Sequence, residues 1–137
     1  MQKTFTILKP DAVKAGNAGA IISRLEKEGF RIRAMKMLHL TKPDAEGFYY
    51  VHKARPFFSG LITFMTEGPV IMMVLEADNA VEKLRKVMGA TDPAKADAGT
   101  IRKDFATNIE RNAIHGSDAP ETAAFEISYF FSQLEMV

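Results

Sequence analysis

An α+β domain built on an antiparallel sheet is the fold class that the sequence predicts, from three observations. Short segments rich in β-branched and aromatic residues alternate with segments whose apolar residues recur at helical spacing. Glycine or proline stands near most of the boundaries between them. The length of 137 residues and a hydrophobic content of 47% suit one core. Because no repeat or linker divides the chain, we expect a single domain spanning residues 1–137.

The first half of the chain contains two predicted strands and three predicted helices. Residues 3–9 are β-branched and aromatic and read as a strand that ends before a proline. Residues 18–29 place apolar side chains at helical spacing and end in glycine, whereas residues 30–40 alternate as in a half-buried strand. Residues 41–50 begin with a threonine cap and a proline in the first turn of a short helix. A further helix follows over residues 56–68.

The second half continues the alternation and predicts a ferredoxin-like order. Residues 70–76 are a buried strand, and Asp78 is expected to cap a helix that ends at glycine 89. A polar loop over residues 89–99 precedes a helical turn at 100–106 and a short strand at 113–115. Asp118 with the glutamate three residues later resembles a capping box for the last helix. This order is nearest to a ferredoxin-like arrangement with the helices on one side of the sheet.

The composition excludes several classes of protein. The 18 basic and 17 acidic residues give a net charge of +1, whereas proteins that bind long nucleic acids usually carry a large basic excess. The absence of cysteine excludes disulfides, thiolate metal sites and thiol nucleophiles. The N-terminus lacks the features of a signal peptide, and the longest apolar run is far shorter than a membrane span. We therefore expect a cytoplasmic protein with no membrane and no nucleic acid as partner.

His115 is the first candidate for chemistry, in the stretch RNAIHGSDAPE between a predicted strand and a predicted helix. Taken alone, it fits a packed structural histidine better than a metal ligand or a nucleophile. Its corner position, the small Gly116 beside it, and the ring hydrogen bond that Ser117 or Glu126 could make favour a functional role. An unperturbed imidazole, with a pKa of about 6.5, is a competent nucleophile at neutral pH without a separate base.

The other candidate residues carry weaker signals when each is taken singly. Lys9 reads as a solvated lysine at a strand end, and Arg85 and Arg102 read as ordinary charged residues on or near helices. Phe57 is expected to be a core aromatic, and Tyr49 fits either a core or a site. The remaining histidines, His39 and His52, are interpreted as surface or packing residues. Familiar phosphate-loop, dinucleotide and zinc motifs are absent.

A series of short motifs nevertheless resembles one known family, the nucleoside diphosphate kinases. The pattern N-x-x-H-G-S-D over Asn112 to Asp118 resembles the active-site signature of that family. Further blocks match in order and spacing: Lys9-Pro10-Asp11-Ala12, Arg55-Pro56-Phe57-Phe58, Gly68-Pro69-Val70, Met88-Gly89-Ala90-Thr91-Asp92-Pro93 and Gly99-Thr100-Ile101-Arg102. The resemblance covers essentially the whole chain, and the short end after Leu134 resembles bacterial members.

The resemblance implies a reaction and a role for each matching residue. The γ-phosphate of a nucleoside triphosphate, mainly ATP, would move to a nucleoside diphosphate by a ping-pong cycle through a phosphohistidine. His115 would attack through Nδ1, while Glu126, helped by Ser117, would hold the other ring nitrogen. Phosphates and sugar would contact a polar set: Lys9, Tyr49, Arg85, Thr91, Arg102 and Asn112. The base would contact an apolar set: Phe57, which would stack on it, Leu61 and Ile109.

The resemblance also implies a cofactor and partners. Mg²⁺ is expected, brought largely by the nucleotide phosphates, with no metal ligands assigned to the chain. The partners would be ATP and other nucleoside triphosphates and diphosphates, including deoxy forms. A homo-oligomer, tetramer or hexamer, is expected. Many family members have Asn immediately before the helix arginine, where this chain has Leu84.

Two alternatives from other classes remain open at this stage. A ferredoxin-like fold also hosts nucleic-acid-binding domains, which would need aromatic residues exposed on the sheet and a basic face. Neither feature is evident in the sequence. A non-catalytic domain that binds nucleotide in the same pocket would not require His115 as a nucleophile, so only activity separates it from a kinase.

Overall fold

The predicted α+β fold with a ferredoxin-like sheet is confirmed by the computed structural model, which describes residues 1–137. Its four strands are β1 (Gln2–Leu8), β2 (Arg31–Leu38), β3 (Val70–Ala77) and β4 (Ile114–Gly116). They form one sheet in the order β2-β3-β1-β4, and every neighbouring pair is antiparallel. The short β4 therefore lies at one edge of the sheet beside β1, and β2 forms the other edge.

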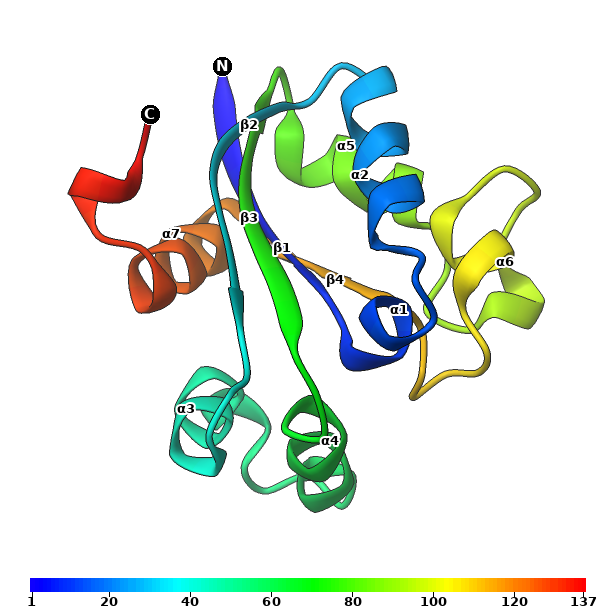
Figure 1. Cartoon of the computed structure of the whole chain (residues 1–137), viewed down its shortest axis with the longest axis vertical. Helices are drawn as coiled ribbons and strands as arrows, with labels where there is room; N and C mark the ends of the chain where they lie inside the picture. The colour runs from blue at the N-terminus through cyan, green and yellow to red at the C-terminus, as the bar shows by residue number, and fades with distance from the viewer.

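Seven α-helices surround the sheet: α1 (Pro10–Lys14), α2 (Ala18–Lys27), α3 (Lys42–Phe48), α4 (Phe58–Met65), α5 (Ala80–Met88), α6 (Ile101–Phe105) and α7 (Pro120–Phe130). Short 3-10 turns lie at Tyr50–His52, Pro93–Lys95 and Gln133–Glu135. Figure 1 shows α2 and α5 along one side of the sheet, α7 on the other side, and α3 with α4 at one end. The five-residue α1 was not predicted, because Pro10 was interpreted only as the end of a strand; it stands at the first position of this helix.

Helices cover both faces of the sheet, so the expectation of one covered side is wrong. Val70, Met72 and Val74 of β3 belong to a core that also contains residues of α3 and α4. Met73 and Leu75 point to the opposite face and join a second core with residues of α1, α2, α5 and α6. This alternation follows from the two-residue period of a strand. A strand covered on both faces is apolar throughout, which is why residues 70–76 read as one buried run.

Two predicted helix caps are wrong, and one is confirmed. Thr41 caps α3 as predicted, accepting a hydrogen bond at 3.2 Å from the backbone N–H of Asp44. Asp78 makes no cap, because Asn79 occupies the capping position of α5 in a left-handed conformation with φ 53°. Asp118 lies outside the capping position of α7, where the backbone N–H of Ala119 donates to the hydroxyl of the residue three positions later. The carboxylate of Asp118 is used elsewhere.

The loop predicted over residues 89–99 connects α5 to α6 with only a single 3-10 turn inside it. Gly89 ends α5 with a φ of 86°, and a side chain there would collide with Thr100. Glycine is thus required both for the backbone conformation and for the close approach. No helix of the structure is both long enough and apolar enough to cross a bilayer.

Leu84 tests the second core, because its side chain is fully buried on the inner face of α5. Leu84→Ala should lower the free energy of unfolding by about 2–5 kcal/mol, through lost apolar burial and the cavity left behind. Urea denaturation measures this, with Leu134→Ala as the matched control, since Leu134 is 95% exposed. A loss at position 84 no larger than that of the control would contradict the described packing.

Candidate active site

A pocket of about 510 Å³ opens at the edge of the sheet where β1 meets β4. The structure brings the residues predicted from the sequence together there. All of them except Ser117 line it: Lys9, Tyr49, Phe57, Leu61, Arg85, Thr91, Arg102, Ile109, Asn112, His115 and Glu126. Ser117 lies behind this lining and contacts Glu126. Residues from distant parts of the chain thus form one concave surface, the usual form of a small-molecule site.

The imidazole of His115 is held by one ring nitrogen. Its Nε2 lies 2.9 Å from Oε1 of Glu126, and the hydroxyl of Ser117 donates to the same oxygen at 2.7 Å. A carboxylate accepts from an N–H, so this contact places the ring proton on Nε2. The other nitrogen, Nδ1, makes no hydrogen bond within the chain and carries the free lone pair. Ser117 fixes the carboxylate that fixes the ring.

Aromatic rings and the backbone set the orientation of His115. The rings of Phe48 and Tyr49 stand edge-on to the imidazole, with centroids 5.6 Å and 6.2 Å away. The hydroxyl of Thr6 on β1 donates to the backbone carbonyl of His115 at 2.7 Å. Gly116 is required beside it, because a Cβ there would lie 2.5 Å from the sulfur of Met88. The imidazole therefore stands in a packed wall with its side chain 19% exposed.

Two buried cations lie on the floor of the pocket. Lys9, at the end of β1, donates to the side-chain oxygen of Asn112 at 2.8 Å. The guanidinium of Arg102 on α6 donates to the carbonyls of Gly89 and Ile114 at 3.1 Å and 2.7 Å. Its Nε is buried and has no partner. Neither cation is paired with a carboxylate, so both remain able to bind an anion.

Burial and mutual repulsion alter the titration of these cations. Burial, then the charge of Arg102, lowers the pKa of Lys9 from its ordinary 10.5 to about 8. Burial, then the charge of Arg85, lowers the pKa of Arg102 to about 10. The folded chain therefore holds positive charge where the surroundings disfavour it, a typical feature of functional sites.

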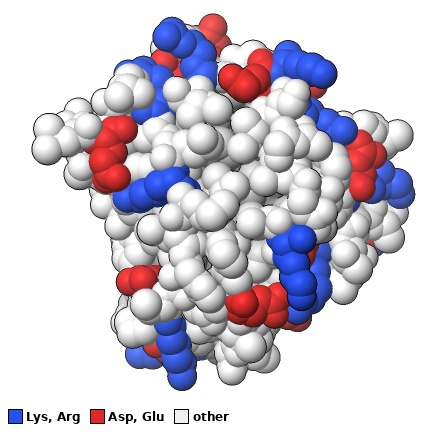
Figure 2. Space-filling view, in the orientation of Figure 1, with Lys and Arg blue, Asp and Glu red and all other residues white.

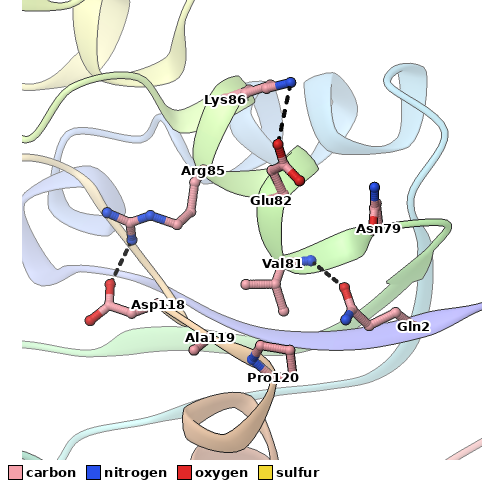
Figure 3. A pocket seen from close by; sticks show the side chains of 9 residues that line it. All are labelled: Gln2, Asn79, Val81, Glu82, Arg85, Lys86, Asp118, Ala119 and Pro120. Carbon is pink, nitrogen blue, oxygen red and sulfur yellow. Dashed lines mark hydrogen bonds and ion pairs between the residues drawn. The ribbon is translucent and has the colours of Figure 1, made fainter.

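Arg85 forms an exposed ion pair at the rim. Its guanidinium lies 2.7 Å from the carboxylate of Asp118. Figure 3 shows the Arg85 side chain leaving α5 toward Asp118, on the segment that precedes α7. The pair separates the main pocket from a second hollow, of about 520 Å³, that includes Gln2 and Glu82. Most residues that line the second hollow are polar or charged, and one of them, Gln2, accepts a hydrogen bond from the backbone N–H of Val81 at 2.9 Å.

Apolar side chains stand at the mouth of the pocket. Phe57 is 53% exposed and Ile109 is 59% exposed, and Leu61 lies with them in the lining. The interpretation of Phe57 as a core residue on its own pattern is therefore wrong. Tyr49 is buried beneath this rim, its hydroxyl has no partner, and burial followed by the charge of Glu126 raises the pKa of that hydroxyl.

Other pocket residues escaped the sequence reasoning. His52 lies in the lining with its ring centroid 5.5 Å from that of Phe57, so its assignment to the surface or packing is incomplete. Phe48, Glu110 and Thr122 also line the pocket. For Glu110 the signal was present, since it precedes the N-x-x-H-G-S-D pattern by two residues. His39 lies on the surface as expected, with its ring bonded to the carbonyl of residue 66.

The surface charges of the protein do not form one large patch of a single sign on the face shown in Figure 2. On the face shown in Figure 2, basic and acidic residues are interspersed around a largely uncharged centre, in keeping with the net charge of +1. No group of three or more histidine, cysteine, aspartate or glutamate side chains is placed to hold a metal ion. Any anion bound in the pocket is held by the few cations placed there.

Comparisons with known proteins identify one family. The chain matches the family profile described as "Nucleoside diphosphate kinase" over residues 2–136. It is 61% identical to the nucleoside diphosphate kinase of Geotalea daltonii and 59% identical to that of Geobacter sulfurreducens, over 137 residues and the full length of both chains in each case.

Solved structures give the same result. A crystal form of the Aquifex aeolicus nucleoside diphosphate kinase superposes with a TM-score of 0.97 at 45% identity, over 99% of each chain. The halophilic enzyme from Halobacterium salinarum, solved with CDP, gives a TM-score of 0.96 at 40% identity, over 99% of this chain and 91% of that one. The chain belongs to the nucleoside diphosphate kinase family.

Proposed function

We propose that the chain transfers the γ-phosphate of a nucleoside triphosphate, mainly ATP, to nucleoside diphosphates through a phosphohistidine at His115. The observation that carries the proposal is the free Nδ1 of an imidazole whose Nε2 is held by Glu126 at 2.9 Å. This nitrogen belongs to a pocket that also contains Lys9, Arg85 and Arg102. Family membership supports the same reaction.

The proposed transfer has two matched halves. The lone pair of Nδ1 attacks the γ-phosphorus, the bond to the bridging oxygen breaks, and the nucleoside diphosphate leaves with that oxygen. Positive charge then develops on the ring, and the carboxylate of Glu126 stabilises it through the Nε2 proton. In the second half the terminal phosphate oxygen of another diphosphate attacks the phosphorus, and the imidazole leaves with its original electron pair.

The cations of the pocket would stabilise the negative charge that spreads over the oxygens of the transferred phosphoryl group. Phosphoryl transfer needs mainly positioning and electrostatic stabilisation, which preorganised buried cations supply. Lys9 and Arg102 are already anchored by Asn112 and by backbone carbonyls. Arg85 would contact phosphates from the rim, and Thr91 lies in the lining where its hydroxyl is available to them.

The aromatic mouth suits a site that accepts every base. Stacking on an aromatic ring tolerates any base, because every base presents a flat face. Phe57 is exposed at the rim for such a contact, with Leu61 and Ile109 as its apolar neighbours. We therefore propose that ribose and deoxyribose nucleotides of all bases bind here. The CDP bound to the Halobacterium salinarum relative supports a pyrimidine among them.

We propose that Mg²⁺ is brought to the pocket largely by the nucleotide phosphates. Mg²⁺ commonly keeps waters and is bound by one or two carboxylates together with substrate phosphates. The pocket fits that pattern: outside the pair with His115, its carboxylates are Glu110 and Asp118, too few for a cage. When bound, the metal would neutralise phosphate charge.

Assembly and location are also proposed. β2 is an edge strand, and its Met35 and Met37 are more than half exposed. Edge strands with apolar side chains tend to pair with another chain. This feature supports self-association, and we propose a homo-oligomer, tetramer or hexamer, as the sequence resemblance implies. A cytoplasmic location is also proposed, in keeping with a sequence that contains no cysteine. The alternatives, a non-catalytic nucleotide-binding or nucleic-acid-binding domain, gain no support from the named relatives.

The phosphorylated intermediate provides the direct test. γ-labelled ATP with Mg²⁺ and no acceptor should label the protein in a form lost in acid and stable in alkali, because phosphate is on nitrogen. Addition of GDP, CDP or UDP should discharge the label into the matching triphosphate. His115→Ala should abolish labelling and still bind ATP, since the cationic and stacking contacts remain. Labelling of the alanine variant would refute the proposed nucleophile.

The stacking role of Phe57 makes a separate prediction. Phe57→Ala should weaken nucleotide binding by about 1–3 kcal/mol, as expected for the loss of one stacked aromatic ring. The loss should be similar for purine and pyrimidine nucleotides, and calorimetric titration with ADP and CDP measures both. Val51→Ala is the control, since Val51 lines the same pocket without an aromatic ring. An unchanged affinity would remove Phe57 from the site.

Lys9 should be a source of instability as well as of activity. Between pH 8 and 10.5 the unfolded chain binds more protons at this residue than the folded chain, so stability should rise with pH across that window. A pKa unit is worth about 1.4 kcal/mol, so the buried charge costs about 3 kcal/mol below pH 8.

Lys9→Met removes that charge and also the hydrogen bond from the ammonium to Asn112, which is worth about 1.5–3 kcal/mol because the donor is charged. The variant should therefore be inactive and about as stable as the natural chain at pH 7, and it should become the less stable of the two toward pH 10, where the natural chain regains the cost of its charge. Thermal unfolding at a series of pH values measures this difference in stability. A difference that does not change between pH 7 and pH 10 would show that the buried charge is not a penalty.

A further inference from the structure

Ala113 has a strained backbone at the centre of the proposed active site. Its φ is 73°, a left-handed value that residues other than glycine rarely adopt. The backbone N–H of Ile114 donates across it to the carbonyl of Asn112 at 2.9 Å. This bond between residues two apart, with positive φ at the middle residue, defines a γ-turn of the strained kind. Such a conformation costs about 1–3 kcal/mol and persists only where its surroundings enforce it.

The segment that follows β1 enforces this turn from both sides. The backbone N–H of Lys9 donates to the carbonyl of Ala113 at 2.9 Å. The carboxylate of Asp11, in the first turn of α1, accepts from the N–H of Ala113 at 3.0 Å. Ala113 is fully buried, so both groups need partners within the protein. Of the two groups that bind the backbone of Ala113, the carboxylate of Asp11 is the one that belongs to a side chain.

Asp11 is a partly buried carboxylate with few other contacts. Burial raises the pKa of Asp11, and the backbone N–H groups of Ala12 and Ala113 oppose that rise. Its second oxygen, Oδ1, is buried without a hydrogen-bond partner, and no ion pair is formed. A half-satisfied carboxylate is expensive inside a protein. The contact to Ala113 is therefore its main interaction outside its own helix.

The turn determines how two residues face the pocket. Asn112 precedes Ala113 and accepts a hydrogen bond from Lys9. His115 lies on β4, two residues after Ala113. A change in φ at Ala113 would rotate one relative to the other. Displacements of about 1 Å in a reacting group can reduce a rate about 100-fold.

We propose that Asp11 is a positioning residue for phosphoryl transfer: its carboxylate holds the Ala113 γ-turn, which aligns Nδ1 of His115 with phosphates bound at Lys9 and Asn112. The inference rests on the proposed role of His115. Asp11 touches no reacting atom in this assignment. Its effect should appear in the rate of transfer to His115 and not in the affinity for nucleotide.

The first test separates rate from binding. Asp11→Ala should slow single-turnover labelling of His115 by γ-labelled ATP about 10- to 100-fold, with the Kd for ATP within about threefold. Asp11→Asn keeps an oxygen that can accept from Ala113, so its rate should stay within about threefold of the natural chain. Asp78→Ala is the matched control, because Asp78 is an exposed carboxylate that does not line the pocket.

The second test asks whether the effect passes through the turn. Glycine adopts positive φ without strain, so in an Ala113→Gly background the loss caused by Asp11→Ala should shrink to about threefold. This background also needs less support to fold, which keeps the comparison available if Asp11→Ala alone is unstable. The proposal is overturned if the loss is equally large in both backgrounds, if Asp11→Asn is as slow as Asp11→Ala, or if Asp11→Ala labels at the natural rate. Failure of the natural chain to label would instead refute the role of His115.

Discussion

The pairing of β4 with β1 is the interaction on which the site depends. It sets Ile7 opposite His115 and so joins the first strand of the chain to the last. β4 has only three residues, too few for a strong ladder of its own. Two further hydrogen bonds extend the pairing: the side-chain hydroxyl of Thr6 donates to the carbonyl of His115, and the backbone N–H of Ser117 donates to the carbonyl of Phe5 at 3.1 Å. The backbone of the site residues His115 and Ser117 thus also holds the edge of the sheet together.

The same pairing concentrates positive charge where the fold least favours it. Lys9 continues β1 past its last ladder residue, and Arg102 reaches the carbonyl of Ile114 from α6. Both cations are more than nine-tenths buried, and neither is offset by a carboxylate partner. Hydrogen bonds to neutral acceptors replace water without neutralising the charge. A phosphate entering this pocket would meet cations already desolvated, so less of its binding energy would go into ordering them.

Much of the fold followed from local pattern, and the failures have physical causes. Strand alternation and glycine or proline boundaries located the strands, because burial on a sheet has a fixed period. Asp118 does not cap α7 because its carboxylate pairs with Arg85, a tertiary contact that the local pattern does not show. Asp78 does not cap α5 because the helix begins one residue later than predicted, after Asn79. The motif resemblance named residues that line one pocket, whereas the local pattern around Phe57 could not show that its side chain is exposed. Nor could the sequence reveal the strain at Ala113, since alanine carries no signal for positive φ.

The three cations of the pocket differ in how freely they can move. The Arg85–Asp118 pair is exposed, with the two side chains 42% and 75% accessible. Exposed pairs of this kind contribute about 0–1 kcal/mol, so an entering phosphate can displace Asp118 at small cost. Lys9 and Arg102, by contrast, are fixed by buried hydrogen bonds. In the proposed cycle, which must bind and release nucleotide in each half, the fixed cations would set where the phosphates lie. Arg85 would add an attraction that is easily reversed.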